Sequence, residues 1–371
     1  MGKKILFNND WEFTKQELVL ENKVKNTEHF IWKKVDLPHD WMIYDTALFD
    51  KDGEGWYRKY FFWDSLEEAT HKICLLRFEG IYMDCTIYVN GSRVGEWKYG
   101  YTTFECDITS ALKQGRNEIL VHVLLKMPNS RWYTGAGIYR NVWLKVVPRL
   151  HFTTDGIYIS TAKMGNEWKV TVEAEVVGVE TEKSQYEIKH TIFDNRGIAV
   201  ASSNGYHTQI IPVRAPHIWD IENPELYMLK TELLCQGKVI DEEINRFGFR
   251  TIDYNAKSGF YLNGCHVKLH GVCLHHDLGA LGAAVNRCAI KRQLTLLKEM
   301  GANAIRTAHN MCAVELLELA DEMGFLVANE AFDMWERPKN QYDYARFFNE
   351  WVERDVANWI RRDRNHPCNI I

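Results

Sequence analysis

The feature that most constrains the fold of this 371-residue chain is a change of hydrophobic period near residue 252. Before that point, short runs alternate between apolar and polar residues and are separated by turn signals, a pattern typical of β-strands. After it, short apolar runs alternate with amphipathic helical patterns, which is typical of parallel βαβ units. The chain is therefore expected to combine antiparallel β domains with strand–helix units of a barrel.

The barrel prediction covers residues 252–371 and rests on three strand–helix units. A (β/α)8 TIM barrel needs eight such units to close, and a fourth apolar run begins only at residues 368–371. The sequence is therefore expected to stop inside the barrel, with Gly301 and Gly324 ending the first two helices. The strands are predicted at residues 267–272, 303–306 and 325–329, and the helices at residues 286–300, 314–323 and 344–362.

Two antiparallel β-sandwiches are predicted before the barrel. Residues 1–148 contain short alternating runs without a long helical pattern, and the Asn90-Gly91 pair is a strong signal for a two-residue hairpin turn. This domain is expected to be a jelly roll. Residues 149–251 contain short strands at the spacing of an immunoglobulin-like sandwich, without the Cys–Trp–Cys spacing of antibody domains.

The composition argues against several classes of protein. Charged residues make up 26% of the chain, the net charge is −5 and both signs are interspersed, so neither a nucleic-acid partner nor an anionic membrane is expected. Nine cysteines without a CxxC pair favour reduced thiols over disulfides or a structural zinc site. The first ten residues do not form a signal peptide, and no apolar run reaches the ~20 residues of a membrane helix. We expect a cytoplasmic location.

Segments from all three predicted domains resemble glycoside hydrolase family 2, the β-galactosidase and β-glucuronidase family. The matching segments occur in the family's order and at compatible spacing along the whole chain. They are residues 37–41, 55–59, 135–142, 270–277, 303–310, 325–332 and 364–367. The resemblance implies a jelly-roll sugar-binding domain, an immunoglobulin-like domain and a catalytic TIM barrel.

The resemblance also implies a retaining exo-β-glycosidase, with a β-galactosidase as the first expectation. Such enzymes use two carboxylates that stand ~5–5.5 Å apart on either side of the glycosidic bond. In this family the acid/base glutamate follows the fourth strand, just beyond Ile371, and the nucleophile lies much later, so no catalytic residue and no activity are expected from this chain alone. A β-glucuronidase and a non-catalytic carbohydrate-binding remnant are the alternatives.

Arg306, His309 and Glu330 are the first candidate substrate-binding residues, because they stand at the C-terminal ends of two predicted barrel strands. Arg306 and His309 are expected to bind sugar hydroxyls, or alternatively to form an ion pair with Glu330. Glu330 and Asp333 are not expected to be a catalytic pair, because two residues on one strand end do not flank a sugar.

His276, Asp277, Arg131 and Trp132 complete the candidate substrate-binding set. His275, His276 and Asp277 are a metal cluster by residue type, but adjacent histidines on a strand face opposite ways, which favours a substrate loop. In this family the first domain lends a loop to the active site, so Trp132 is expected either to stack on a sugar or to fill the domain interface.

One departure from the family is the Met311-Cys312 pair, where relatives usually have a proline, and a looser loop is expected there. No metal site and no cofactor are predicted, and a structural magnesium or sodium ion in a full-length enzyme stays open. The expected partners are a carbohydrate substrate and, for the full-length enzyme, further copies of itself in a homo-oligomer.

Overall fold

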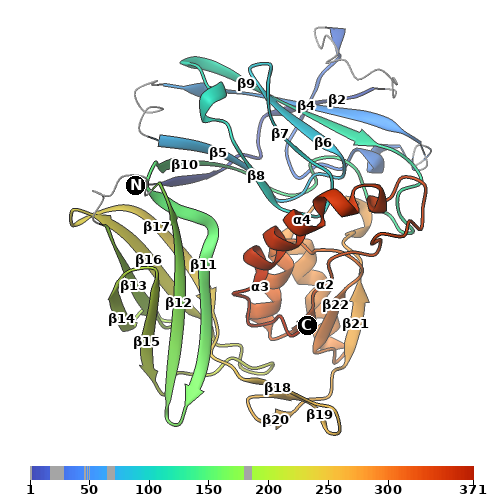
Figure 1. The fold of residues 1–371 in the computed structure, drawn as a ribbon. Coiled ribbons are helices and arrows are strands. Elements are labelled where there is room, and N and C mark those ends of the chain that lie inside the picture. The colour runs from blue at the N-terminus through green and yellow to red at the C-terminus, as the bar shows by residue number, and fades with distance from the viewer. Residues whose placement is uncertain are drawn as a thin grey trace.

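The computed structural model describes residues 2–16, 29–45, 47, 49, 51–64, 72–178 and 186–371. The chain forms two β-sandwiches and a three-stranded parallel sheet with its helices, in the predicted order (Figure 1). Figure 1 shows the first sandwich above the other two parts, with α4 directly beneath it. All nine cysteines are free thiols. Within the described ranges, no helix is long and apolar enough to cross a membrane.

The first domain packs a four-stranded sheet, ordered β1-β10-β5-β8, against a six-stranded sheet, ordered β3-β2-β4-β9-β6-β7. The predicted Asn90-Gly91 turn joins β6 to β7, and both residues have the positive φ (50° and 83°) that a type I′ turn requires. The strands are β1 (Lys3–Leu6), β2 (Trp11–Gln16), β3 (Lys33–Val35), β4 (Gly53–Trp63), β5 (Lys72–Phe78), β6 (Cys85–Val89), β7 (Ser92–Trp97), β8 (Phe104–Asp107), β9 (Gly115–Leu125) and β10 (Val142–Pro148).

The second domain is an antiparallel sandwich with sheets ordered β11-β12-β15 and β14-β13-β16-β17. Its inward-facing residues alternate with outward-facing ones, as in β12, where Val170 and Val172 are fully buried, Thr171 between them is half-exposed and the flanking Lys169 and Glu173 are exposed. The strands are β11 (His151–Met164), β12 (Glu167–Val177), β13 (Tyr186–Phe193), β14 (Ala199–Gly205), β15 (Thr208–Arg214), β16 (Tyr227–Cys235) and β17 (Lys238–Phe247).

A small antiparallel sheet, which the sequence pattern did not reveal, comes between this sandwich and the barrel strands. Its strands are β18 (Ile252–Asn255), β19 (Gly259–Leu262) and β20 (Cys265–His266), which are short and have no helix between them. The parallel units then follow as β21 (Gly271–Leu274), α2 (Arg287–Glu299), β22 (Ala304–Thr307), α3 (Val314–Met323), β23 (Leu326–Ala328) and α4 (Phe348–Asp363). The first barrel strand therefore begins at Gly271, later than predicted. A 3-10 turn, Tyr344–Arg346, replaces the predicted start of the third helix.

The parallel sheet has the order β21-β22-β23, and the last residues of the chain extend it. The Val327 N–H donates to the Cys368 carbonyl oxygen at 2.7 Å, and the Ile370 N–H donates to the Val327 carbonyl oxygen at 3.0 Å. Residues 368–371 therefore lie parallel to β23, as the predicted fourth strand requires.

The first domain and the barrel part share one hydrophobic core. Its buried residues include Tyr99 and Phe104 of the first domain together with Phe332, Phe348 and Trp351 of the barrel part. The immunoglobulin-like domain has a separate core and is joined to the barrel part by Trp219, which is fully buried and donates to the Asp321 carbonyl oxygen at 2.9 Å. This arrangement fixes the first domain against the carboxyl edge of the parallel sheet.

Candidate functional site

Arg306, His309 and Glu330 meet at the C-terminal ends of β22 and β23, and we call them the recognition cluster. Arg306 Nε donates to Glu330 Oε1 at 2.6 Å, and Arg306 Nη2 lies 3.0 Å from His309 Nδ1. Their side chains remain 42%, 26% and 32% exposed for Arg306, His309 and Glu330. The predicted ion pair thus exists, and the cluster still faces solvent at the edge where TIM barrels bind ligands.

His309 Nδ1 contacts both other members of the recognition cluster. It lies 3.0 Å from Arg306 Nη2, which only donates hydrogen bonds, and 3.3 Å from Glu330 Oε2, which accepts them, so the two contacts favour opposite proton positions on the ring. Nε2 has no hydrogen-bond partner within the described part of the chain. The cluster therefore offers the Nε2 atom of His309 and carboxylate oxygens at Glu330, which together suit neighbouring hydroxyl groups.

The first-domain loop that contains Arg131 and Trp132 reaches this same edge. Arg131 donates to both oxygens of Asp333, at 2.6 and 3.2 Å, and Lys339 Nζ lies 2.7 Å from the same carboxylate. Burial alone would raise the pKa of Asp333, but hydrogen bonds from Arg131 and Lys339 lower it below its ordinary value. Asp333 is therefore a charged anchor for the loop.

Trp132 places an aromatic ring beside the recognition cluster. Its ring centroid lies 5.5 Å from that of His309 and 5.2 Å from that of His275, while its indole N–H donates to Tyr101 Oη at 3.2 Å. The side chain is half-buried. Trp132 thus fills part of the domain interface and also lines the edge of the site, so the contacts fit both predicted roles.

Asp40 holds the loop in place from inside the first domain. Its carboxylate is 1% exposed and accepts hydrogen bonds from the Tyr133 hydroxyl (2.5 Å), the Ala136 N–H (3.0 Å) and, on the barrel side, the Ala283 N–H (2.9 Å). Gly135, with φ of +65°, lets the backbone pass so close that a Cβ would lie 2.5 Å from the carboxylate. The segment at residues 37–41 therefore supplies, through Asp40, the hydrogen bonds that hold the loop against the barrel part.

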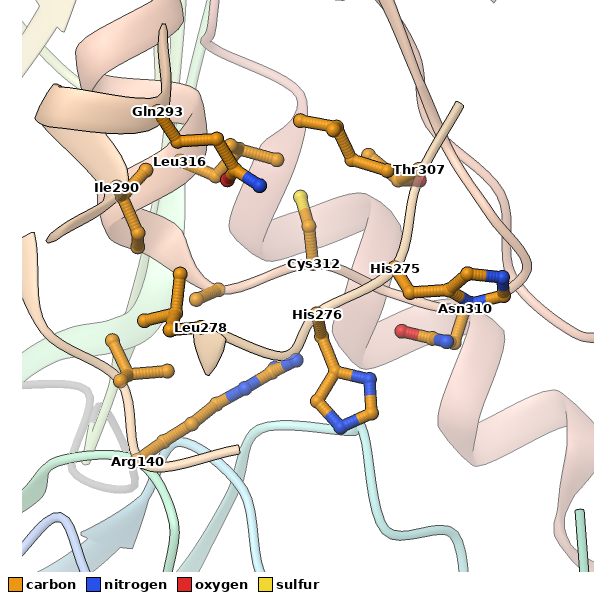
Figure 2. A pocket seen from close by; sticks show the side chains of 13 residues that line it. Arg140, His275, His276, Leu278, Ile290, Gln293, Thr307, Asn310, Cys312 and Leu316 are labelled. Carbon is orange, nitrogen blue, oxygen red and sulfur yellow. The ribbon is translucent and has the colours of Figure 1, made fainter. Parts of the chain in front are cut away.

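The neighbouring histidines point in different directions (Figure 2). His275 is exposed, and its ring lies 5.6 Å from that of His309. His276 instead donates from Nε2 to the Thr134 carbonyl oxygen at 2.9 Å, and burial lowers its pKa to about 3. The side chain of Asp277 makes no hydrogen bond with another described residue. The structure therefore brings His275 to the recognition cluster, and places His276 at the domain interface.

A cavity of about 40 Å³ lies between β21, α2, α3 and Arg140 (Figure 2). Three buried polar atoms without a partner among the described residues belong to side chains that line it, namely Arg140 Nε, His276 Nδ1 and Asn310 Nδ2. This volume and polarity suit one or two water molecules rather than a substrate.

Two buried arginines hold the Met311-Cys312 segment that departs from the family pattern. Arg140 Nη2 donates to the Met311 carbonyl oxygen at 2.7 Å, and Arg362 Nη2 donates to the Cys312 carbonyl oxygen at 2.9 Å. Both residues of the pair are buried, and burial raises the pKa of the Cys312 thiol to about 12. The expectation of a loose loop therefore finds no support in these contacts.

Among the described residues, the group with metal-ligand spacing is Asp321, His366 and Cys368, whose ligand atoms lie within 4.8 Å of one another. His366 Nδ1 already bonds Asp321 Oδ2 at 2.5 Å, and the Cys368 N–H donates to Asp321 Oδ1 at 2.9 Å. These bonds satisfy the carboxylate and attach residues 366–368 to α3. We interpret the group as a structural ion pair.

The residues that position the site without facing it carry no signal in the sequence pattern. Asp333 was predicted only as a neighbour of Glu330. Its ion pair with Arg131 joins residues that are 202 positions apart, so no local pattern indicates it. Asp40 and Arg362 likewise carry no local signal, because each makes a contact that crosses domains, Asp40 with Ala283 and Arg362 with Thr103.

Two sandwiches followed by parallel strand–helix units, with basic and aromatic side chains at the strand ends, define a class of multidomain glycoside hydrolases. Three sequence profiles match the chain: the sugar binding domain of glycosyl hydrolases family 2 at residues 20–148, the family 2 domain at residues 151–250, and the family 2 TIM barrel domain at residues 255–371. The chain belongs to glycoside hydrolase family 2.

The relatives of this chain include proteins named as β-galactosidases and proteins named as β-glucuronidases. A β-galactosidase of Bacteroides ovatus is 40% identical over 97% of this chain and 45% of its own length. A protein of Formosa agariphila with a provisional β-glucuronidase name is 37% identical over 97% of this chain and 36% of its own length. A crystal structure of a family 2 member from Bacteroides cellulosilyticus superposes with a TM-score of 0.90 at 36% identity, over 99% of this chain and 51% of that one. This chain thus spans about half the length of these relatives, or less.

Proposed function

We propose that the natural gene product that contains residues 1–371 is a retaining β-glycosidase, and that this chain supplies part of its sugar-recognition surface. The observation that supports the proposal is the recognition cluster with Trp132 beside it. The carboxyl ends of the parallel strands place together an indole ring for the apolar face of a sugar, and an imidazole and a carboxylate for its hydroxyls.

A terminal β-galactoside is the substrate class that we favour. Arg306, the cation in the cluster, is neutralised by Glu330 at 2.6 Å, so the cluster has no free positive charge for a sugar carboxylate. A neutral sugar with several hydroxyls suits such a surface. The first of the relatives described above is named as a β-galactosidase, which agrees with this preference.

A β-glucuronide is the second candidate, and one observation supports it. Arg131 and Lys339 share the single carboxylate of Asp333, which leaves one positive charge in excess next to Trp132. A sugar carboxylate placed there would meet that charge.

The test is hydrolysis of aryl β-D-galactosides and aryl β-D-glucuronides by the natural gene product. We expect kcat/KM for the galactoside to exceed that for the glucuronide by at least ten-fold. The reverse ratio would replace the first proposal with the second. Binding of either sugar without hydrolysis would instead support the non-catalytic alternative.

A further inference from the structure

A larger cleft, of about 500 Å³, lies where all three parts of the chain meet. Its walls come from β5, β7 and β8 of the first domain, β11 of the second, and α4 of the barrel part, which converge at the centre of Figure 1. It shares no lining residue with the recognition cluster. A volume in this range is typical of sites for small molecules, whereas the 40 Å³ cavity of Figure 2 is not.

The carboxylates of this cleft already have cationic partners. Asp155 accepts from Arg77 Nη1 at 2.9 Å, and Glu105 accepts from the Thr154 hydroxyl at 2.9 Å and lies 3.8 Å from Lys145 Nζ. A ligand that enters the cleft therefore meets no unpaired lining carboxylate among the described residues.

Two arginines of the lining keep unused donors. Arg354 has no carboxylate partner in the described part of the chain, and its guanidinium lies 4.9 Å from the Trp351 ring centroid. Arg77 is 7% exposed, and its Nε is a buried donor without a partner among the described residues. The cleft thus has an excess of positive charge and of N–H donors, and Arg354 is on its exposed side.

Neutral groups in the same cleft suit a hydroxylated ligand. Asn358 donates from Nδ2 to the Thr103 carbonyl oxygen at 3.1 Å, which leaves its Oδ1 as an acceptor. The Thr153 hydroxyl has no partner among the described residues. Trp97, half-buried and stacked on Phe104 with centroids 5.0 Å apart, provides an aromatic wall. Charge, hydroxyl-binding groups and an indole are the combination that recognises a charged sugar.

We propose that this cleft binds a monosaccharide with one anionic group, a sugar acid or a sugar phosphate. The anionic group lies on Arg354, the hydroxyls lie on Asn358 and Thr153, and the apolar face of the ring lies on Trp97. Because the walls belong to three domains, the occupied cleft holds them together, and ligand raises the melting temperature by mass action. The site is separate from the recognition cluster and does not depend on the glycosidase proposal.

Calorimetric titration and thermal melting of the 371-residue chain test the proposal with four probes: D-glucuronate, glucose 6-phosphate, D-glucose and inorganic phosphate. At least one of the two sugar anions is expected to bind ten-fold more tightly than both glucose and inorganic phosphate, and to raise the melting temperature. Tight binding of only one of these two ligands shows whether the cleft recognises the carboxylate of a sugar acid or the phosphate of a sugar phosphate. Equal binding of all four probes, no binding, or inorganic phosphate as tight as the sugar anions would overturn the proposal.

Variants then locate the site. Arg354→Ala should weaken binding of the sugar anion at least ten-fold, and Ala357→Glu, which adds a carboxylate and bulk to an exposed lining position on α4, should do the same. Arg292→Ala, which removes an exposed arginine from α2 outside the cleft, should leave binding unchanged. If His309→Ala abolished binding and Arg354→Ala did not, the sugar would occupy the recognition cluster and the cleft proposal would be wrong.

Discussion

The first domain meets the barrel part in two regions with opposite chemistry. At the rim, Arg131 binds Asp333 through a side chain that is 51% exposed. Inside, Asp355 is fully buried and accepts hydrogen bonds from the Trp97 indole (2.8 Å), the Thr102 hydroxyl (2.6 Å) and the Tyr344 hydroxyl. The rim contact is solvated on the Arg131 side, with the Asp333 side chain 5% exposed, and lies beside Trp132. The inner contact is dry and belongs to the shared core.

The difference in burial between the two contacts indicates that one stabilises the domain interface and the other positions the sugar-recognition loop. Exposed ion pairs contribute about 0–1 kcal/mol, and removing one partner of a buried pair costs several times more. The inner contacts are therefore expected to hold the domains together. The rim contact positions Trp132 and can change with little effect on the fold.

Arg362→Ala should cause the largest loss of stability. Arg362 and Asp363 form an ion pair whose side chains are 3% and 4% exposed, and Arg362 also donates to the Cys312 carbonyl oxygen. Its removal leaves a buried carboxylate without its cation, at a cost of about 3–5 kcal/mol in the free energy of unfolding. Chemical denaturation measures the loss.

The matched control is Arg361→Ala, one position earlier on α4. Arg361 pairs with Glu175 at 2.6 Å, but the two side chains are 29% and 48% exposed. This substitution should cost no more than about 1 kcal/mol. Equal losses for the two variants would show that burial does not set the cost of breaking an ion pair on α4.

Asp355→Asn should change how stability depends on pH. Burial raises the pKa of Asp355 to about 6 from an ordinary 3.8, against the opposing effect of its hydrogen bonds. The folded protein thus holds the proton more tightly than the unfolded chain. The stabilisation from this proton is complete below about pH 4, is lost as the pH rises to about 6, and amounts to about 2–3 kcal/mol.

Melting curves between pH 4 and 7 compare the wild type with Asp355→Asn. The stability of the wild type relative to the variant should fall across this window, because the amide does not titrate. A constant difference at every pH would mean that Asp355 titrates in the folded chain as it does in the unfolded one.

Arg131→Ala should have the smallest effect on stability. The exposed guanidinium contributes less than about 1 kcal/mol, and Lys339 remains to pair with Asp333. Chemical denaturation should therefore give nearly the wild-type free energy of unfolding. A loss of about 3 kcal/mol or more in the free energy of unfolding would mean that the rim contact stabilises the fold as much as a buried ion pair does.

The sequence predicted most of the fold, because period and turn chemistry are local. The helix predicted at residues 314–323 coincides with α3 at both ends, and the predicted Asn90-Gly91 turn joins β6 to β7. The short sheet β18–β20 was missed, whereas the equally short strands β21–β23 were revealed by the helical patterns that follow them. The start of β21 was predicted too early because the alternating segment at residues 267–270, Val-Lys-Leu-His, precedes the strand rather than forming it.

The site was predictable only in part, for a physical reason. Arg306, His309 and Glu330 follow strands that are neighbours in a parallel sheet, so their proximity follows from the strand pattern. The contacts of Asp40 with Ala283 and of Arg131 with Asp333 join domains that are far apart in sequence. Their partners depend on how the domains dock, which local patterns do not encode.

The most direct test of the account is the kinetics of Trp132→Ala in the natural gene product with an aryl β-D-galactoside. If Trp132 recognises the sugar, kcat/KM should fall roughly ten-fold or more, by about 1.4 kcal/mol, with the melting temperature nearly unchanged. Trp132→Phe, which keeps a ring but loses the bond to Tyr101, should retain most of the activity. Unchanged kinetics together with a large fall in melting temperature would contradict the account, and would make Trp132 only a filler of the domain interface.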